Sequence, residues 1–274
     1  MCRLLGYCAR RTTSLAGIIG EEGLRDFTAL SAFHSDGWGM AWADGRPGGP
    51  IQVRKSPLRA SGDPAYAELA RQRLARLGIV HLRWATPGLA VGTENSHPFC
   101  LRNVAMAHNG AIHPQDRLPE LLPPDWERLA TGGTDSERYF LHVVCRLEAG
   151  GDMLTAIGET AASITARFAV NSLNAVLLTP TALYAVCCHD RSMIPSARLR
   201  SRGYPGSAAE IACHFDLAYR QTADAVVVAS SDWPQDPRDG WTTLPNGHVL
   251  MVAGDTLQTK IYPLPVPASL SEAP

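Results

Sequence analysis

The sequence predicts an α+β fold in which two antiparallel sheets are covered by helices. Strand patterns joined by turns occupy both ends of the chain, and the two strongest helix patterns lie in the middle. Strands do not alternate with helices as they would in a parallel βαβ array. We expect one domain over residues 2–262 and a Pro-rich, loosely ordered tail over residues 263–274.

Three strands and one weak helix are predicted near the N-terminus. Residues 3–10 and 37–43 have strand patterns, and a Gly- and Pro-rich turn at residues 43–50 leads into a third strand at residues 51–54. The second and third strands therefore form a hairpin. Between the first two strands, residues 21–33 carry apolar side chains at helical spacing.

The next segment is predicted to form a better helix, which two strands follow. Asp63 can cap a helix over residues 64–77, whose leucines fall roughly on one face, and Gly78 can end it. Residues 79–84 and 104–107 are then predicted as strands that end in polar residues.

The strongest helix pattern covers residues 135–149, and a second helix is expected at residues 153–168. Thr134 and Glu137 would form a capping box at the start of the first of these helices. The chain then returns to strands, which are expected at residues 173–178, 183–188, 225–229, 248–252 and 257–262.

Composition argues against several classes of function. The 274 residues carry a formal net charge of −1, and no basic stripe is present that would steer nucleic acid. No apolar run reaches the ~18 residues that span a bilayer, and the N-terminus lacks the pattern of a secretory signal. We therefore expect a cytoplasmic protein that binds neither nucleic acid nor membranes.

The seven cysteines predict neither a disulfide framework nor a zinc ribbon, because they are odd in number and lack C-x-x-C spacing. An alternative is a metal site formed by the cluster Cys187, Cys188, His189, Cys213 and His214. Adjacent residues on a strand face opposite sides, which is poor ligand geometry for Cys187 and Cys188. Buried strand cysteines are the favoured interpretation, and no metal or cofactor is expected.

A cysteine directly follows the initiator methionine. Methionine is removed readily before a small residue, so the mature chain would begin with Cys2 and carry a thiol and a free amine on one residue. An α-amine has a pKa near ~8 and is partly free base at neutral pH, so it can activate the thiol without a histidine. Taken alone, the position of Cys2 could equally be accidental.

Four further stretches point to the same chemistry. They are HSDGWG at residues 34–39, HLRWAT at 81–86, AHNG at 107–110 and GGTDSE at 132–137. Together with Cys2, and in this order, they resemble the glutaminase domain of class II glutamine amidotransferases, which are N-terminal nucleophile hydrolases. The resemblance covers most of the chain and implies a four-layer αββα sandwich.

The resemblance also implies a role for each matched residue. Cys2 would be the nucleophile that attacks the side-chain amide of glutamine or another γ-glutamyl group. The Asn109 side chain and the Gly110 backbone N–H would form the oxyanion hole. The substrate-binding residues would be Arg83 for the α-carboxylate, Asp135 for the α-amine, and Trp84 and Thr86 beside them.

Most of these residues also have a structural interpretation. Asn109-Gly110 in isolation indicates a type I′ hairpin turn. Arg83 could form a structural salt bridge, and Asp135 could interact with the dipole of its helix. His108 could act as a general base, but an N-terminal nucleophile already has its amine.

Three other residues near these motifs are interpreted separately. Asp36 and Trp38 are expected to shape the sheet rather than to take part in chemistry. Pro87 departs from the family pattern, because members that make amino sugars usually carry histidine there. The substrate pocket is therefore expected to differ at this point.

The resemblance predicts a cysteine-dependent amidohydrolase that releases glutamate from glutamine or a γ-glutamyl compound through a γ-glutamyl thioester. In size and motif order, the chain is similar to a stand-alone γ-glutamyl hydrolase of ergothioneine synthesis. No synthase domain is expected after residue 262, so a glutaminase subunit would need a separate synthase to accept its ammonia. A non-catalytic γ-glutamyl sensor is a third alternative, although a sensor would not need the nucleophile.

Overall fold

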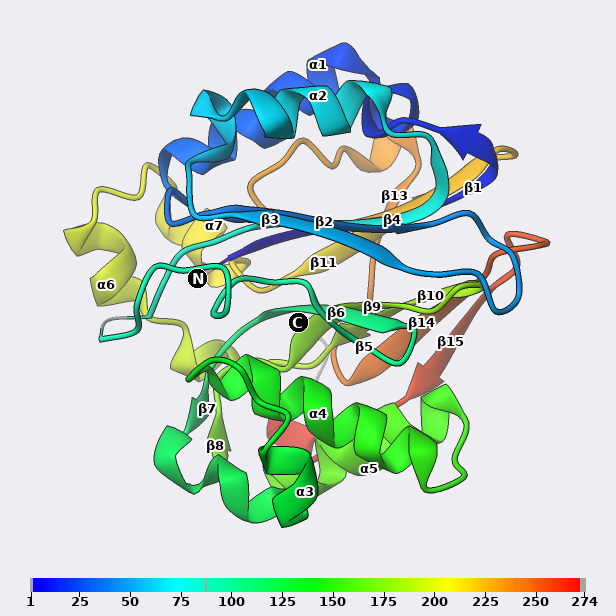
Figure 1. The fold of residues 1–274 in the computed structure, drawn as a ribbon. Helices are drawn as coiled ribbons and strands as arrows, with labels where there is room; N and C mark the ends of the chain where they lie inside the picture. Colours follow the sequence, from blue (N-terminus) through cyan, green and yellow to red (C-terminus); the bar gives the residue numbers. More distant parts are fainter. Residues whose placement is uncertain (1, 87, 272–274) are drawn as a thin grey trace.

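The protein folds into four layers, in the order helices, sheet, sheet, helices (Figure 1). The computed structural model describes residues 2–86 and 88–271. Both large sheets are antiparallel throughout, so the predicted α+β class and the αββα order implied by the family resemblance are confirmed.

The first sheet has seven strands in the order β13-β11-β12-β1-β4-β2-β3. β1 lies at its centre and pairs with β12 on one side and β4 on the other. The strands are β1 (Arg3–Thr13), β2 (Trp38–Ala43), β3 (Gln52–Ser56), β4 (Ala75–Leu82), β11 (Leu217–Gln221), β12 (Ala225–Ser230) and β13 (Trp241–Thr243).

The second sheet has six strands in the order β15-β14-β10-β9-β6-β5. They are β5 (Phe99–Leu101), β6 (Val104–Asn109), β9 (Asn174–Leu178), β10 (Ala182–Cys187), β14 (His248–Ala253) and β15 (Thr259–Pro263). A separate two-stranded sheet is formed by β7 (Ile112–His113) and β8 (Ala169–Val170).

Helices cover the outer faces of both large sheets (Figure 1). α1 (Leu15–Ala29) and α2 (Pro64–Gln72) lie over the first sheet, and α4 (Asp135–Glu148) and α5 (Met153–Thr165) lie under the second. The shorter helices are α3 (Pro124–Glu127), α6 (Ser196–Ser201) and α7 (Ala208–Ala212).

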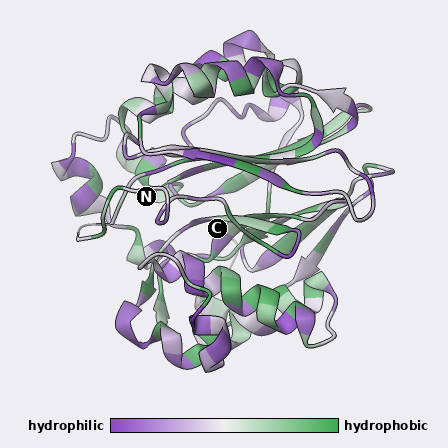
Figure 2. Ribbon diagram, viewed as in Figure 1, coloured by the Kyte–Doolittle hydropathy of each residue, from purple (hydrophilic) through white to green (hydrophobic). Residues whose placement is uncertain are grey.

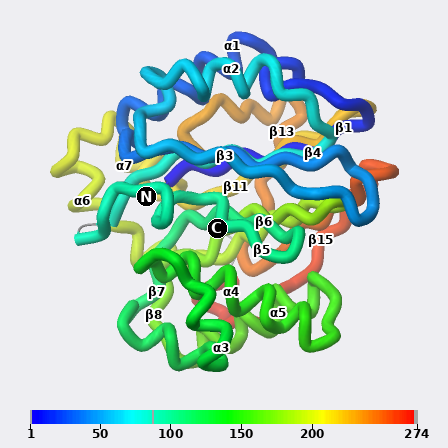
Figure 3. The backbone as a smooth tube through the Cα atoms, viewed as in Figure 1, coloured from blue at the N-terminus to red at the C-terminus, as the bar shows by residue number. Residues whose placement is uncertain are grey.

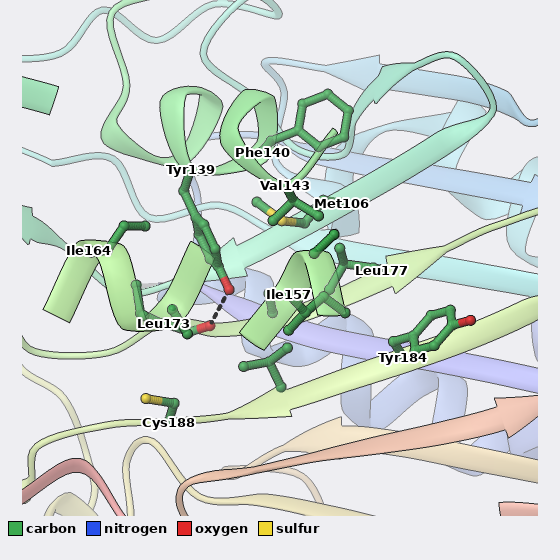
Figure 4. Close-up of a cluster of buried hydrophobic side chains, with 14 of the residues drawn as sticks. Met106, Tyr139, Phe140, Val143, Ile157, Ile164, Leu173, Leu177, Tyr184 and Cys188 are labelled. Carbon is green, nitrogen blue, oxygen red and sulfur yellow. Dashed lines mark hydrogen bonds between the residues drawn. The ribbon is translucent and has the colours of Figure 1, made fainter. Parts of the chain in front are cut away.

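Apolar side chains fill the three spaces between the layers. One cluster joins α1 and α2 to the first sheet, a second lies between the sheets, and a third joins the second sheet to α4 and α5. Figure 2 shows hydrophobic colour concentrated in the inner strands and in α5, and hydrophilic colour along α6. In the third cluster the Tyr139 hydroxyl donates a hydrogen bond to the Leu173 carbonyl at 3.4 Å, which satisfies its one polar group (Figure 4).

The helix predicted at residues 64–77 is too long. α2 ends at Gln72, and residues 75–82 form β4. β4 pairs with β1 and β2, and this long-range pairing outweighs the helical spacing of the leucines. Gly78 lies inside this strand instead of ending a helix, and a Cβ there would come within 2.4 Å of Tyr7 Cε1.

The weak helix predicted at residues 21–33 begins earlier than expected. α1 starts at Leu15 because the Ser14 side chain accepts a hydrogen bond from the Gly17 N–H at 3.1 Å. The helix continues through a kink at Gly20, whose φ is 77°. The other predicted helices and strands are confirmed to within a few residues at their ends. The sequence analysis missed β5, β7, β8, β11, β13, α3, α6 and α7, all of which are five residues or shorter except α6 with six.

The C-terminal segment is better ordered than predicted. Leu264 and Leu270 are buried in the cluster beneath the second sheet, and the Leu264 N–H donates to the Gly247 carbonyl at 2.8 Å. A 3₁₀ turn at Ala268–Leu270 presents the second leucine to this cluster. Residues 272–274 lie outside the described part of the chain, and the domain boundary at residue 262 stays a prediction.

Asp63 joins α2 to the first sheet. Its carboxylate accepts hydrogen bonds from the Trp38 indole N–H at 2.9 Å, the Ser56 hydroxyl at 2.6 Å and the Ala65 N–H at 3.0 Å. Trp38 is fully buried in the sheet, so its N–H depends on this acceptor. Burial alone would raise the pKa of Asp63, but the three hydrogen bonds outweigh it and lower the pKa below its usual value.

Asp63→Ala is expected to lower the free energy of unfolding by about 3 kcal/mol, since it removes a helix cap and leaves a buried indole N–H without an acceptor. Because the folded-state pKa is lowered, the stabilisation is fully present above the unfolded pKa of about 3.9 and disappears as the pH falls through the folded value. Urea unfolding from pH 7 to pH 2 measures both effects. Asp152→Ala, at the exposed cap of α5, is the matched control and should lower the free energy of unfolding by a smaller amount. An equal decrease in the two variants would contradict the role of Asp63.

Candidate active site

The candidate site lies where β1 begins and where β4 and β6 end. Figure 3 shows the N-terminus beside the segment that follows β4 and close to α6. A pocket of about 180 Å³ opens there. Six of the seven site residues named from the sequence line it, namely Cys2, Arg83, Trp84, Thr86, Gly110 and Asp135. The seventh, Asn109, is fully buried and hydrogen-bonds Cys2.

Strand alternation directs Cys2 and Asn109 into the space between the sheets. Leu4, two residues after Cys2, belongs to the cluster between the sheets, and so does Ala107, two residues before Asn109. Because side chains on a strand repeat their direction every second residue, Cys2 and Asn109 face each other from opposite sheets. The Cys2 backbone nitrogen donates to Asn109 Oδ1 at 2.9 Å.

The Cys2 thiol is held against the backbone of Trp84. The Trp84 N–H donates to Sγ at 3.5 Å, and Sγ lies 3.8 Å from the Trp84 carbonyl oxygen. The register that pairs Arg3 with Leu82 brings the end of β4 to this position. Only 9% of Cys2 is exposed, so the thiol is reached through the pocket.

Asn109 has a free donor in a buried position. Its Oδ1 accepts from Cys2, whereas Nδ2 has no hydrogen-bond partner within residues 2–86 and 88–271. A buried donor without an acceptor is destabilising, by about 1–3 kcal/mol, and calls for an explanation such as a ligand. Nδ2 is therefore available to an oxygen atom bound beside Cys2.

Asn109-Gly110 is not a type I′ hairpin turn. Asn109 is the last residue of β6 and pairs with Asn174, and neither Asn109 nor Gly110 has a positive φ. The tight turn of this region lies earlier, where Arg102 and Asn103 have φ of 51° and 56° between β5 and β6. Gly110 is required for another reason, because a Cβ would lie 1.9 Å from the Ser172 carbonyl oxygen.

Arg83 carries a buried guanidinium that has no ion-pair partner among the described residues. Only 3% of the residue is exposed, and its Nη2 donates to the Ala90 carbonyl at 3.1 Å. Within the described residues, Nη1 has no hydrogen-bond partner and no acidic side chain forms an ion pair with it, so the structural salt bridge is not found. Burial lowers the pKa of Arg83, and nearby Cys2, Asp36 and Glu94 partly oppose this shift.

Asp135 begins α4 and faces the pocket with only 4% of its surface exposed. Its Oδ2 accepts from the Ile112 N–H at 2.9 Å, which ties the helix to β7. The predicted capping box of this helix is only half present. Thr134 accepts from the Glu137 N–H, but the Glu137 carboxylate binds the N–H groups of Thr131 and Gly132 instead of returning to Thr134.

Asp36 positions the segment that carries Arg83 and Trp84. Its Oδ2 accepts from the Ala85 N–H at 2.8 Å, and its own N–H donates to the Arg83 carbonyl at 3.0 Å. These contacts, and the hydrogen bond from Trp38 to Asp63, agree with the architectural interpretation of the HSDGWG motif. The expectation about Pro87 falls outside the described residues.

His108 is fully engaged in hydrogen bonds. Its Nε2 lies 3.0 Å from the Ser172 carbonyl oxygen and must donate to it, so Nδ1 accepts from the Ser136 hydroxyl at 2.9 Å. Burial lowers the pKa of His108, while Asp135 and the Ser172 carbonyl act in the opposite direction. With both ring nitrogens occupied, His108 is poorly placed to act as a base for Cys2.

A pair of buried histidines, whose contact the sequence analysis did not predict, supports the end of β6. The His108 N–H donates to His97 Nδ1 at 3.3 Å, and His81 Nε2 lies 3.0 Å from the same nitrogen. Because His97 Nδ1 accepts from a backbone N–H, it carries no proton, and His81 Nε2–H must be the second donor. Burial lowers the pKa values of His81 and His97 well below the usual range, so both rings are neutral.

Arg3 supports the backbone of Cys2, a role that the sequence analysis did not predict. It is fully buried behind Cys2, donates to the Cys2 carbonyl at 3.2 Å and forms an ion pair with Asp232. It also donates to the His214 carbonyl at 3.3 Å. The available signal was an arginine in an apolar strand directly after the candidate nucleophile.

The alternative metal site is not supported by the geometry of its cysteines. Cys187 lies in the cluster between the sheets, and Cys188 lies in the cluster beneath the second sheet, so their side chains face opposite sides as predicted. Among the described residues, no group of three or more His, Cys, Asp or Glu side chains is placed to hold a metal ion. No helix in the same residues is long and apolar enough to cross a bilayer.

Comparison with known proteins identifies the family. The family described as "Glutamine amidotransferases class-II" matches residues 1–271. The chain therefore belongs to the class-II glutamine amidotransferases, which are enzymes that hydrolyse the side-chain amide of glutamine.

Two curated relatives and one solved structure illustrate the relationship. A candidate glutamine amidotransferase of Haemophilus influenzae is 32% identical over 148 residues, which cover 52% of this chain and 47% of that protein. The glutamine–fructose-6-phosphate aminotransferase (isomerizing) of Halobacterium salinarum is 30% identical over 62% of this chain and 26% of its own length. The chain thus spans less than half of each relative.

The solved structure is a glutamine aminotransferase class-II domain protein from Silicibacter pomeroyi. Its TM-score is 0.60 at 18% identity, and the alignment covers 97% of this chain and 100% of that one. At this identity the likeness establishes the fold alone. The fold agrees with the four layers described above.

His97→Leu is expected to lower both stability and turnover. Two buried donors, the His108 N–H and His81 Nε2–H, would lose their acceptor, at a cost of about 3 kcal/mol in the free energy of unfolding. Displacement of Asn109 at the end of β6 should lower kcat at least about tenfold. Urea unfolding and glutamate release measure the two effects.

His97→Asn is the matched control, because its Oδ1 can occupy the place of Nδ1 and accept the same hydrogen bonds. This variant should retain most of the stability. Equal destabilisation of the Leu and Asn variants would contradict the acceptor role of His97.

Proposed function

We propose that the protein is a cysteine-dependent amidohydrolase that releases glutamate from glutamine or a γ-glutamyl compound through a γ-glutamyl thioester on Cys2. The observation that carries this proposal is the hydrogen bond between the Cys2 nitrogen and the buried Asn109 Oδ1, beside the pocket that Cys2 lines. One amide side chain orients the nitrogen next to the nucleophile, and its own Nδ2, which has no partner among the described residues, would serve the substrate.

Removal of Met1 would convert the Cys2 nitrogen into an α-amine with a pKa near 8. The amine takes the thiol proton as Sγ attacks the amide carbonyl, and a tetrahedral intermediate forms. The amine then gives this proton to the leaving nitrogen as the C–N bond breaks, which leaves the thioester. A water molecule, deprotonated by the same amine, attacks the thioester carbonyl and releases glutamate and the thiol.

Two donors would stabilise the negative charge on the tetrahedral intermediate. Asn109 Nδ2 is buried and without a partner among the described residues, and the Gly110 N–H follows it in the chain. Donors that are fixed before the reaction need no reorganisation, and each contributes about 3 kcal/mol to transition-state stabilisation. Both ends of the Asn109 amide would therefore act in catalysis.

The charged side chains that line the pocket suit a glutamyl group. Arg83 offers a guanidinium nitrogen that has no partner among the described residues to the α-carboxylate, and Asp135 offers a buried carboxylate to the α-amine. Trp84 and Thr86 line the same pocket and complete its wall. A glutaminase subunit that passes ammonia to a separate synthase would use the same residues, and such a partner stays a prediction.

Cys2→Ala should abolish glutamate release while the protein stays folded, because the nucleophile is removed without disturbing β1. A protein that retains Met1 should also be inactive, since an amide nitrogen cannot carry the proton. Glutamate release, thermal unfolding and intact mass measure activity, folding and processing. Full activity in either protein would contradict the mechanism.

Arg83→Ala and Asn109→Ala are expected to affect different kinetic constants. Loss of the carboxylate partner should raise KM by at least about tenfold with a smaller change in kcat, whereas loss of the oxyanion donor should lower kcat by about 100-fold or more. Arg83→Lys, which keeps the charge, should recover part of the lost binding. Steady-state kinetics test this division, and parallel changes in both constants for both variants would contradict it.

A further inference from the structure

A second cation lines the pocket and has no role in the proposed mechanism. Arg198 lies on α6, which stands beside the N-terminus (Figure 1), and reaches the pocket with a half-buried side chain. Its Nη2 donates to the Ala85 carbonyl at 2.9 Å, and its guanidinium lies 4.8 Å from the centre of the Trp84 ring. Within residues 2–86 and 88–271, it forms no ion pair and no other side-chain hydrogen bond.

The two cations of the pocket are held on different segments. Arg83 is bound to Ala90 in the loop after β4, whereas Arg198 comes from α6 and is bound to Ala85. A glutamyl group has a single α-carboxylate, which would bind Arg83, and a single α-amine, which would bind Asp135. Its third end is the scissile amide at Cys2, so Arg198 is left for the atoms beyond the amide nitrogen.

Arg198 is bound next to the segment that holds the Cys2 thiol. Burial and neighbouring Arg202 lower the pKa of Arg198, while Asp36 and Cys2 act in the opposite direction. The Ala85 carbonyl that it binds is one residue from Trp84, whose backbone holds the Cys2 thiol. A group bonded to the leaving nitrogen would therefore lie close to this guanidinium.

The chemistry of the leaving group separates two kinds of substrate. Glutamine releases ammonia, which offers nothing for a guanidinium to bind and would be repelled as ammonium. The amine of an α-amino acid carries a carboxylate on the adjacent carbon, and a guanidinium with free N–H donors is suited to bind it. The position of Arg198 therefore favours a substrate whose leaving group is an α-amino acid.

We propose that Arg198 is a specificity-determining residue that binds a carboxylate on the leaving group. The substrate class is then the γ-glutamyl derivatives of α-amino acids, with glutamine as a poorer substrate. This inference rests on the proposed function, because it takes the scissile amide to lie at Cys2.

The test uses γ-glutamylalanine and γ-glutamylethylamide, which differ only in the carboxylate of the leaving group, together with glutamine. The Met1-processed protein should prefer γ-glutamylalanine over the ethylamide by at least about tenfold in kcat/KM, which corresponds to 1.4 kcal/mol. Arg198→Gln should reduce this ratio to near one, and its activity on the ethylamide should fall much less. Arg200→Gln, on the exposed side of the same helix, is the matched control and should behave as the unmodified protein.

A ratio that Arg198→Gln leaves unchanged, or no preference in the unmodified protein, would overturn the proposal. If Arg198→Gln lowers kcat/KM equally on all three substrates, the role of Arg198 is instead to attach α6 to the rest of the protein. The affinity of the Cys2→Ala protein for the two γ-glutamyl compounds, measured by calorimetry with and without Arg198→Gln, decides the question independently of turnover. If the protein releases glutamate from none of the three substrates, the proposed function is contradicted. The ratio of the affinities for γ-glutamylalanine and γ-glutamylethylamide would still support or overturn the role of Arg198.

Discussion

The hydrogen bond between the Cys2 nitrogen and Asn109 Oδ1 joins the two sheets at the candidate site. Cys2 precedes the central strand of the first sheet, and Asn109 ends a strand of the second, so the bond forms only when the sheets stack in the correct position. Small residues allow this close approach: Ala107 faces the space between the sheets, and a Cβ on Gly6 would lie 2.7 Å from Val176 Cγ1. The packing of the sheets therefore sets the geometry of the nucleophile.

In and beside the pocket lie buried donors that lack partners among the described residues. Arg83 Nη1 and Asn109 Nδ2 are both in this state, and folding bears the free-energy cost of leaving them unpaired. A bound molecule that provides acceptors for these donors would offset this cost. Asp135 and Arg198 add one charge of each sign to the same pocket. The arrangement suits a zwitterionic glutamyl group with a second anionic group beyond its amide.

The fold class and the motif residues could be predicted because they depend on local patterns. Period-two alternation and turn residues identified most strands, and the ordered motifs identified residues that the fold brings to one pocket. The errors arose where long-range pairing decides the structure, as in β4, whose leucines fit a helix until β1 and β2 pair with it. Arg3 and Arg198 were missed for the same reason, because their partners lie far away in the sequence.

The most direct test of the account is to find which residue a glutamine analogue with an electrophilic diazoketone labels in the Met1-processed protein. Peptide mass mapping after stoichiometric inactivation should place a single adduct on Cys2, and excess glutamate should slow its formation. Inactivation by an adduct on another cysteine, such as the exposed Cys100 or Cys213, would contradict the central claim. Full activity after complete labelling of Cys2 would contradict it as well.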